Sequence, residues 1–380
     1  METLASPGFF YTFGVFALVI GVLVFVHEFG HYGMARIFGI KVEAFAVGFG
    51  REILGWTDRH GTRWKLGWIP MGGYAKFAGD ANAASQPDHA LEATLSAGER
   101  ANLFHNRPLY QRALVVAAGP AINFVFAILI FALFFMTYGH QITPPVLGGV
   151  QEGSPAAAAG LQPGDRLLKA DGQSLERFED LTMVVAINPG TPIDFVLERD
   201  GVEKSLTVTP KVVTEKDRFG NSYSRGMLGV ASGKLVVVRH GPVQALRWAI
   251  VETGATVRMM WETIVQVVMG RRHLQDLGGP VKIAQYSGQS AVLGLPALIS
   301  FIALVSINLG FINLLPIPML DGGHLFLYAI EGVRRRPLNP KIQEWAFMSG
   351  FALLMSLMLV LTWNDLQSIG LWDTLASVVG

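Results

Sequence analysis

The sequence predicts an α-helical membrane protein with four transmembrane helices and an inserted domain of mixed α and β structure. The first observation is composition: 51% of the 380 residues are hydrophobic and only 16% are charged, whereas globular proteins average about 25% charged residues. The second is a set of four apolar segments, each near the ~20 residues that cross a bilayer. The third is a long stretch between the second and third segments with the strand and turn patterns of a water-soluble domain.

The four apolar segments differ in purity. The first contains His27, Glu28 and His31 in its second half, whereas the second is almost entirely apolar. No Lys or Arg precedes the first segment, so it lacks the basic region of a signal peptide and is predicted to remain as a membrane helix. A soluble protein could bury one such run in its core, but four in one chain favour a membrane. The segments run from about Phe9 to Phe38, Ala113 to Tyr138, Leu295 to Leu315 and Trp345 to Trp363.

Lys and Arg near the segment ends predict the orientation, because these residues are enriched in cytoplasmic loops. Residues 1–10 and 364–380 contain neither, whereas the connections after the first and third segments are basic. We therefore expect both connections in the cytoplasm, and both termini and the stretch from Gly139 to about Pro280 outside. The basic residues are Arg36, Lys41, Arg107, Arg112, Arg334, Arg335, Arg336 and Lys341.

Two absences restrict the chemistry. The chain has no cysteine, which excludes disulfides, cysteine nucleophiles and Cys-ligated metals, so a metal must be held by His, Asp, Glu or backbone oxygens. The formal net charge is +1, and no basic cluster is interleaved with aromatic residues. We therefore expect no nucleic-acid partner.

The first segment contains a His-Glu-x-x-His motif from His27 to His31. Residues i and i+4 share a helix face, so both imidazoles can reach one metal ion, and the carboxylate of Glu28 can activate a water molecule there. Three ionisable groups in an apolar helix are costly unless they face protein, water or a metal. The alternative is a structural polar cluster between helices.

A catalytic zinc site needs a third protein ligand, and the best candidate is Asp321 in the stretch NLLPIPMLDGGH, residues 313–324. Its two prolines prevent a continuous helix, and irregular backbone at membrane depth is tolerated where it is buried in protein or lines a cavity. The first and third segments both run inward, which places the motif and Asp321 at similar depth. Asp321 could instead only cap the following helix. His324 is the second-ranked ligand.

The stretch SPAAAAGLQPGDRLLKADG, residues 154–172, resembles a PDZ domain of the bacterial protease type. In that resemblance the small-residue run is a short helix, and the chain then turns into a buried strand. We expect a PDZ-like α+β domain over residues 141–232, flanked by membrane segments with the metalloprotease motif and a β-hairpin loop (1–140). An amphipathic helical linker (233–290) and the last two membrane helices (291–380) follow.

Taken together, these motifs and the inserted PDZ-like domain are similar to the site-2 protease family, in its RseP-type bacterial branch. The best-known RseP-type proteins carry two PDZ domains in tandem, whereas this chain has room for one. The resemblance rests on HEFGH, on Asn-x-x-Pro-x-Pro-x-Leu-Asp-Gly at 313–322, and on further matches at residues 47–79, 106–127, 277–288 and 363–366.

The resemblance implies that His27, His31 and Asp321 bind one Zn²⁺ per chain and that Glu28 is the general base. It also implies a substrate contact at Asn313 and a membrane-associated β-hairpin at 47–79, against whose edge an unwound substrate adds as a strand. We expect the substrate to meet Gly72, Gly73 and Tyr74; the alternative is a bare surface hairpin.

The implied activity is intramembrane proteolysis in a bacterial inner membrane, with the active site toward the cytoplasm and both termini and the PDZ-like domain periplasmic. Implied substrates are single-pass proteins such as anti-sigma factors, already trimmed by another protease, or remnant signal peptides. The PDZ-like domain would exclude substrates with bulky exterior domains or bind a new C-terminus. A non-enzymatic PDZ scaffold and a metal-ion transporter are the rival functions.

Overall fold

The chain folds into two compact units in this computed structural model. The first, the helical unit, comprises residues 1–134 and 243–380, and the second comprises residues 135–242. The residues that the structure describes are 8–80, 95–96, 100, 103–216, 222–270, 278–336 and 338–368.

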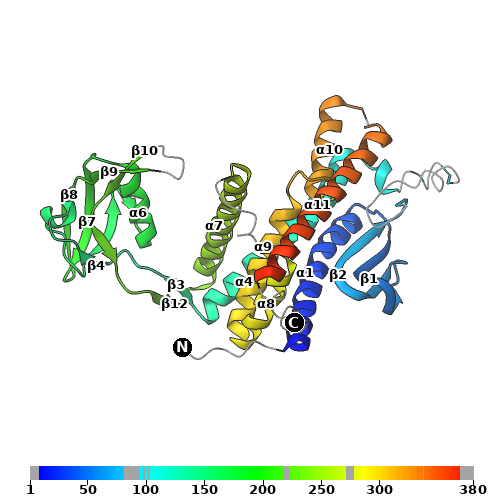
Figure 1. Ribbon diagram of the computed structural model, residues 1–380, viewed down its shortest axis with the longest axis horizontal. Coiled ribbons are helices and arrows are strands. Elements are labelled where there is room, and N and C mark those ends of the chain that lie inside the picture. The colour runs from blue at the N-terminus through cyan, green and yellow to red at the C-terminus, as the bar shows by residue number, and fades with distance from the viewer. Residues whose placement is uncertain are drawn as a thin grey trace, which may run out of the picture. The chain divides into compact units, whose positions relative to one another are not determined.

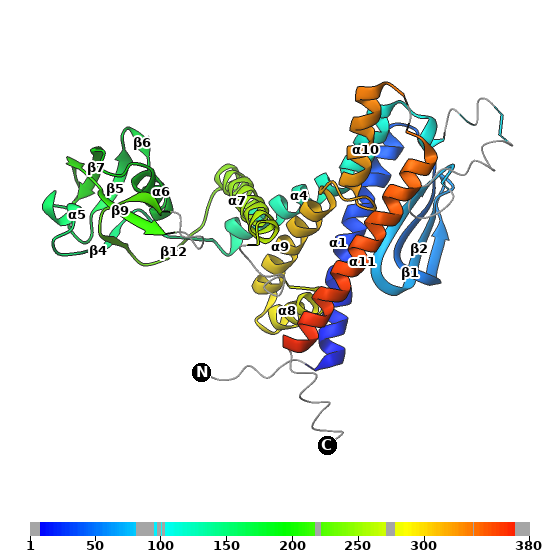
Figure 2. The same ribbon diagram turned by 45° about the horizontal axis from the view of Figure 1, so that its top comes forward.

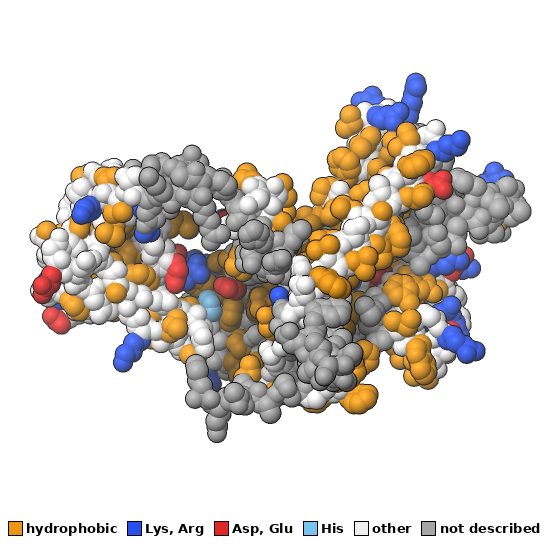
Figure 3. All heavy atoms as spheres, viewed as in Figure 1, with side chains coloured by type: hydrophobic (Ala, Val, Ile, Leu, Met, Phe, Trp, Pro, Cys, Tyr) orange, Lys and Arg blue, Asp and Glu red, His pale blue; other side chains and the backbone are white. Residues whose placement is uncertain are grey.

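Four helices among the described residues are long and apolar enough to cross a membrane. They coincide with the four predicted segments, although the last one starts five residues earlier than predicted. Between 11% and 39% of the residues in each spanning window are buried, so each helix also exposes many apolar side chains. On the face drawn in Figure 3, hydrophobic side chains gather over the helical unit. These helices are α1 (Phe9–Ile37), α4 (Leu109–Thr137), α9 (Leu295–Asn313) and α11 (Pro340–Ser368) (Figure 1).

Three further helices belong to the helical unit: α7 (Pro242–Val268), α8 (Pro280–Val292) and α10 (Asp321–Arg334). Helix α8 packs against α1, α9 and α11. Its first turn is capped by Asp365 of α11, a fully buried residue that accepts the backbone N–H groups of Gly279 at 3.1 Å and Lys282 at 3.0 Å. A carboxylate at a helix N-terminus satisfies orphan donors and suits the helix dipole.

Strands β1 (Val42–Thr57) and β2 (Arg63–Phe77) form an antiparallel hairpin beside α1 (Figure 2). Asp58 closes its turn by accepting the N–H groups of His60 and Thr62 and the indole N–H of Trp64. No third strand among the described residues pairs with this sheet. Residues 44–47 of β1 and 63–66 of β2 are paired on both sides, so the open edges lie along residues 54–57 and 73–77. The hairpin exposes several large apolar side chains, including Leu54, Trp56 and Trp68.

The second unit is built on an antiparallel sheet in the order β6-β5-β7-β8. Leu167, Phe195 and Leu197 from its central strands are fully buried and pack with Leu181 of α6. The run of small residues forms the expected short helix α5 (Pro155–Ala158), capped by the hydroxyl of Ser154. The other elements are β5 (Arg166–Ala170), β6 (Gln173–Ser174), α6 (Phe178–Ile187), β7 (Ile193–Arg199) and β8 (Val202–Val208).

Three two-stranded pairs complete the second unit, and two of them join its beginning to its end. A cavity of about 560 Å³ lies between α6 and the segment 225–231, which includes the end of β10 and the connection Leu228-Gly229. The pairs are β3 (His140–Ile142) with β12 (Val236–Val238), β4 (Leu147–Val150) with β11 (Val230–Ser232), and β9 (Lys211–Lys216) with β10 (Ser222–Met227).

A buried ion pair makes the stability of the second unit depend on pH. Arg199 donates two hydrogen bonds of 2.6 Å to the carboxylate of Asp165. Burial alone would raise the pKa of Asp165, but the hydrogen bonds from Arg199 and from the N–H of Gln162 outweigh it and lower the pKa. Because the folded-state pKa is depressed, this stabilisation is present above the unfolded pKa of about 3.9 and is lost as the pH falls.

We expect amide-exchange protection in β5 and β7, corrected for intrinsic rates, to fall between about pH 5 and pH 3 in the intact protein. The Arg199→Met variant should lose about tenfold in protection at neutral pH, because it removes charge-assisted hydrogen bonds. It should also lose most of the pH dependence. Hydrogen-exchange mass spectrometry measures both effects, and an equal pH dependence in the two proteins would contradict the assignment to Asp165.

Candidate metal centre

Helix α1 places His27 and His31 one turn apart on the same face. Both side chains are buried, at 8% exposure each, and their Nε2 atoms lie 3.3 Å apart. The spacing follows from the helical repeat, which brings residues i and i+4 together. Two imidazoles therefore face one point from a helix that is mostly apolar.

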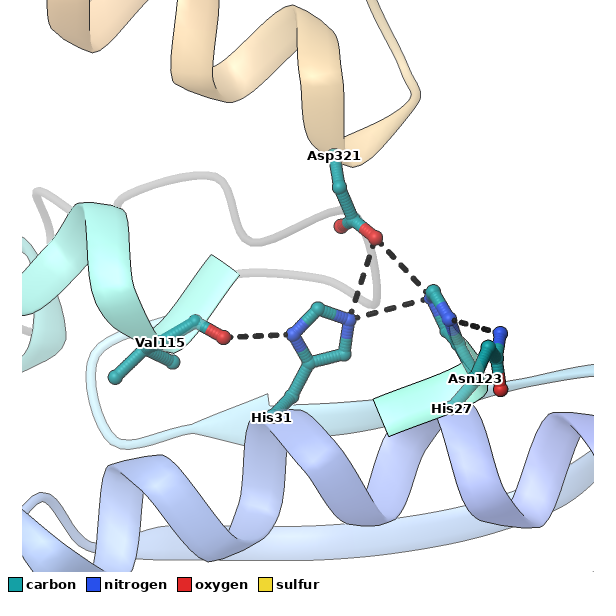
Figure 4. Close-up of polar contacts among 5 residues, drawn as sticks. All are labelled: His27, His31, Val115, Asn123 and Asp321. Atoms are coloured by element: carbon teal, nitrogen blue, oxygen red, sulfur yellow. Dashed lines mark hydrogen bonds and ion pairs between the residues drawn. The ribbon is translucent and has the colours of Figure 1, made fainter. Parts of the chain in front are cut away.

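Asp321 reaches the same point from the other end of the sequence. Helix α9 ends at Asn313, two residues before the predicted end of the third segment. Pro316 and Pro318, which lack N–H groups, lie in the connection, and α10 begins at Asp321. The Asp321 Oδ2 atom lies 3.1 Å from His27 Nε2 and 3.5 Å from His31 Nε2 (Figure 4).

Neither a capping role for Asp321 nor a ligand role for His324 fits the structure. The N-cap of α10 is Leu320 and no side chain caps this helix end, so Asp321 is its first residue and not its cap. His324, one turn further on, is outside the group formed by His27, His31 and Asp321. Its ring packs against Phe347, with centroids 4.9 Å apart.

The donor atoms suit a cation. His31 Nδ1 lies 2.9 Å from the carbonyl oxygen of Val115, and because a carbonyl only accepts, Nδ1 carries the hydrogen and Nε2 keeps its lone pair. That lone pair faces the carboxylate of Asp321, whose Oδ2 is buried without a hydrogen-bond partner. Electron pairs that face one another in a buried site repel unless a positive charge lies between them.

The distances suit zinc. Tetrahedral zinc with ligand bonds of 2.0–2.1 Å requires its ligand atoms to be about 3.3 Å from one another. The three separations here are 3.1, 3.3 and 3.5 Å. Three protein ligands leave the fourth position of a tetrahedron open, which is the arrangement of catalytic zinc sites.

Helix α4 approaches α1 closely at this level, and glycines make the approach possible. A methyl group on Gly119 would overlap the ring of His31, and one on Gly30 would overlap the carbonyl group of Ala118. Small residues allow such close contacts between membrane helices. Gly119 could not be predicted from the sequence, because a glycine in an apolar helix does not by itself reveal its neighbour.

A cavity of about 440 Å³ is lined by His27, His31 and Asp321 and by the other site residues predicted from the sequence. Gly73 lies directly against α1: a Cβ atom there would be 2.6 Å from Val24 Cγ1 and 3.3 Å from Glu28 Cγ. The hairpin thus forms one wall of the cavity. The predicted residues that line it are His27, Glu28, His31, Gly72, Gly73, Tyr74, Asn313 and Asp321.

An ion pair holds α10 against α4. Arg112 donates to the carboxylate of Glu331 at 3.0 Å and stacks over the ring of Tyr328 at 4.8 Å. Glu331 also accepts the N–H of Leu338 and is 7% exposed. The helix that begins with Asp321 is therefore fixed to the helix that contacts His31.

Zinc binding should be sensitive to a single methyl group at Gly119. Because that methyl overlaps the His31 ring, we expect Gly119→Ala to weaken zinc affinity by at least about tenfold, as displaced ligands do. Gly33→Ala on α1 is the control, since a Cβ atom there meets nothing within 4 Å. Zinc content of the purified proteins in a series of free-zinc buffers measures the effect, and equal affinities would contradict the close approach.

Comparison with known proteins identifies the family of this chain. The model of peptidase family M50 matches residues 15–357. The Agrobacterium fabrum protein Atu1380, whose name assigns it provisionally to the zinc metalloproteases, is 45% identical over 371 residues, which cover 96% of this chain and 98% of that protein. Metalloprotease MmpA of Caulobacter vibrioides is 38% identical over 374 residues, covering 92% and 94% of the two chains.

Among solved structures, the PDZ domain of an SdrC-like protein from Listeria monocytogenes aligns with 24% of this chain and 87% of its own length, at 14% identity and a TM-score of 0.19. That score is too low to support an argument about the fold. The family match and the relatives cover nearly the whole chain. The chain therefore belongs to peptidase family M50, the site-2 protease family, and is a multi-pass membrane zinc metalloprotease.

Proposed function

We propose that this protein is an intramembrane endopeptidase that cleaves the transmembrane segments of single-pass membrane proteins. The observation that carries the proposal is one cavity that contains His27, His31, Asp321 and Glu28 and lies among helices apolar enough to span a bilayer. A protease whose chemistry is held between such helices acts on peptide bonds that reach the same depth.

In this proposal His27, His31 and Asp321 hold one zinc ion per chain. A bound zinc ion supplies Lewis acidity, which polarises a scissile carbonyl and acidifies a water molecule. Glu28, adjacent to His27 and on the cavity wall, takes the proton from the attacking water and returns it to the leaving amine nitrogen.

The hairpin and Asn313 would bind the substrate. A helical substrate must unwind before a peptide bond can reach the metal, and an open strand edge replaces the backbone hydrogen bonds that are lost. Gly72, Gly73 and Tyr74 of β2 lie in the cavity wall with Asn313. The exposed apolar side chains of the hairpin support its association with the membrane.

The proposed orientation follows the basic residues. Lys and Arg side chains gather at the end of the helical unit near α10 and α11 (Figure 3), which we assign to the cytoplasmic side of a bacterial inner membrane. Both termini and the PDZ-like domain, 141–232, then face the periplasm, while the segments 1–140 and 291–380 form the catalytic membrane part and 233–290 links them.

The PDZ-like domain would select substrates. We favour exclusion of proteins with bulky exterior domains, so that only substrates already trimmed by another protease enter. Anti-sigma-factor-like proteins and remnant signal peptides fit this description, and their cleavage is regulated intramembrane proteolysis. The cavity between α6 and the segment 225–231 favours a second role, in which the domain binds the new C-terminus of a trimmed substrate.

The Glu28→Gln variant should lower cleavage of a reporter transmembrane helix by at least about 100-fold, because it removes the general base. It should retain zinc, because the three ligands are intact. Glu344→Gln, an exposed change on α11, is the control and should cleave normally. Cleavage and zinc content are measured on the same purified samples. Undiminished cleavage by Glu28→Gln would rule out this mechanism. If the protein were a non-enzymatic scaffold, neither the wild type nor Glu344→Gln would cleave the reporter.

Strand addition can be tested by cross-linking, because the chain contains no cysteine of its own. In the Glu28→Gln background, Tyr74→Cys should form disulfides with single cysteines placed near the cleavage site of a substrate. Trp56→Cys, at the exposed far end of β1, should not. Equal cross-linking from both positions would indicate that the hairpin is not a substrate edge.

A further inference from the structure

We propose that Asn123 is a positioning residue for His27: its side-chain carbonyl oxygen accepts the His27 Nδ1 hydrogen and so leaves Nε2 free to bind the metal. The inference rests on the proposed role of His27 as a zinc ligand. Asn123 lies on α4 and is completely buried. Its amide Nδ2 atom lies 3.1 Å from His27 Nδ1 (Figure 4), and its Oδ1 atom has no hydrogen-bond partner among the described residues.

The tautomer of His27 decides whether it can be a ligand. A neutral imidazole has one N–H and one lone pair, so a ring that binds zinc through Nε2 must carry its hydrogen on Nδ1. That hydrogen needs an acceptor. Of the two ends of the Asn123 amide, only the oxygen accepts, whereas the NH₂ group would donate to Nδ1 and leave the hydrogen on Nε2.

The same pocket accommodates both orientations of the amide, because its nitrogen and oxygen ends have nearly the same size. With NH₂ toward the ring, the Nε2 hydrogen points toward Asp321 Oδ2, 3.1 Å away, and occupies the place of the metal. With the oxygen toward the ring, three lone pairs converge. Zinc binding therefore selects the second orientation.

His31 shows the same principle with a fixed acceptor. Its Nδ1 lies 2.9 Å from the carbonyl oxygen of Val115, which cannot donate. Val115 and Asn123 are eight residues apart on α4, whereas the histidines they contact are four apart on α1. One helix thus provides the partner of each imidazole, one from its backbone and one from a side chain. Partners of this kind orient metal-binding histidines and raise their basicity.

Asn123 is itself held in place from the other side. Its backbone oxygen accepts the hydroxyl hydrogen of Ser306 at 2.9 Å, and both residues have no exposed surface. Helix α9 approaches closely here, since a Cβ atom on Gly310 would lie 3.3 Å from Asn123 Cβ. The amide is therefore clamped between α9 and α1, and it can hold the His27 ring at a fixed angle.

The test compares zinc affinity, measured by competition with a chromophoric chelator, and the visible spectrum of the cobalt-substituted full-length protein in detergent. Asn123→Leu keeps the volume and removes the acceptor. We expect its zinc affinity to fall by about 10- to 100-fold and its cobalt spectrum to change. Phe131→Leu, a buried change two turns further along α4, is the control and should behave like wild type.

Asn123→Asp keeps an acceptor and nearly the same shape. A carboxylate on the far nitrogen strengthens a metal-binding imidazole, so this variant should bind zinc at least as tightly as wild type. It also keeps the inference testable if Asn123→Leu does not elute as a folded monodisperse protein. A folded Asn123→Asp variant that binds zinc at least tenfold more weakly than wild type would overturn the inference.

The His27→Ala variant distinguishes a failure of the proposed metal site from a failure of the role proposed for Asn123. If it loses zinc while Asn123→Leu binds with wild-type affinity and an unchanged cobalt spectrum, the role of Asn123 is refuted and the metal site stands. If His27→Ala binds zinc as tightly as wild type, the proposed metal site fails, and the inference about Asn123 fails with it.

Discussion

The rest of the helical unit depends on the convergence of three electron-pair donors in a buried site. His27 and His31 come from α1 and Asp321 from the start of α10, and their donor atoms lie within 3.5 Å of one another. Without a cation this arrangement is repulsive, so the surrounding helices must hold it together. The close approach of α4 to α1 and the Arg112–Glu331 ion pair between α4 and α10 keep the histidines of α1 and Asp321 of α10 in place before any metal binds.

The sequence predicted those parts of the site that have a local pattern. His27, Glu28 and His31 follow from helical spacing, and the four spanning helices follow from runs of apolar residues, because both depend on neighbours in the chain. Asp321 required a comparison of depth and a family resemblance, since no spacing rule links residues almost 300 positions apart. The end of α9 at Asn313 lies two residues from the predicted end of its segment, because the two prolines that follow it signal the end of a helix.

Other parts of the site had no usable signal. The acceptor for His31 is the backbone carbonyl of Val115, and every residue has such a carbonyl. Asn123 is an exception, because it is an amide side chain within a nearly apolar segment. Polar groups at membrane depth usually have a function. The irregular register of the hairpin was also beyond prediction, because bulges depend on how the strands pack against α1 and not on strand propensity.

In the proposed mechanism, the open edges of the hairpin pass through a cycle of hydration. Unpaired backbone groups in hydrocarbon cost several kcal/mol each, so edges at membrane depth would need water between substrates. Each substrate strand that added to an edge would displace that water, and each departing product would let it return. The binding free energy of a substrate strand is therefore limited, because water could not replace a strand that bound too tightly. We expect turnover to follow the exchange of water at the edge as much as the chemistry at the metal.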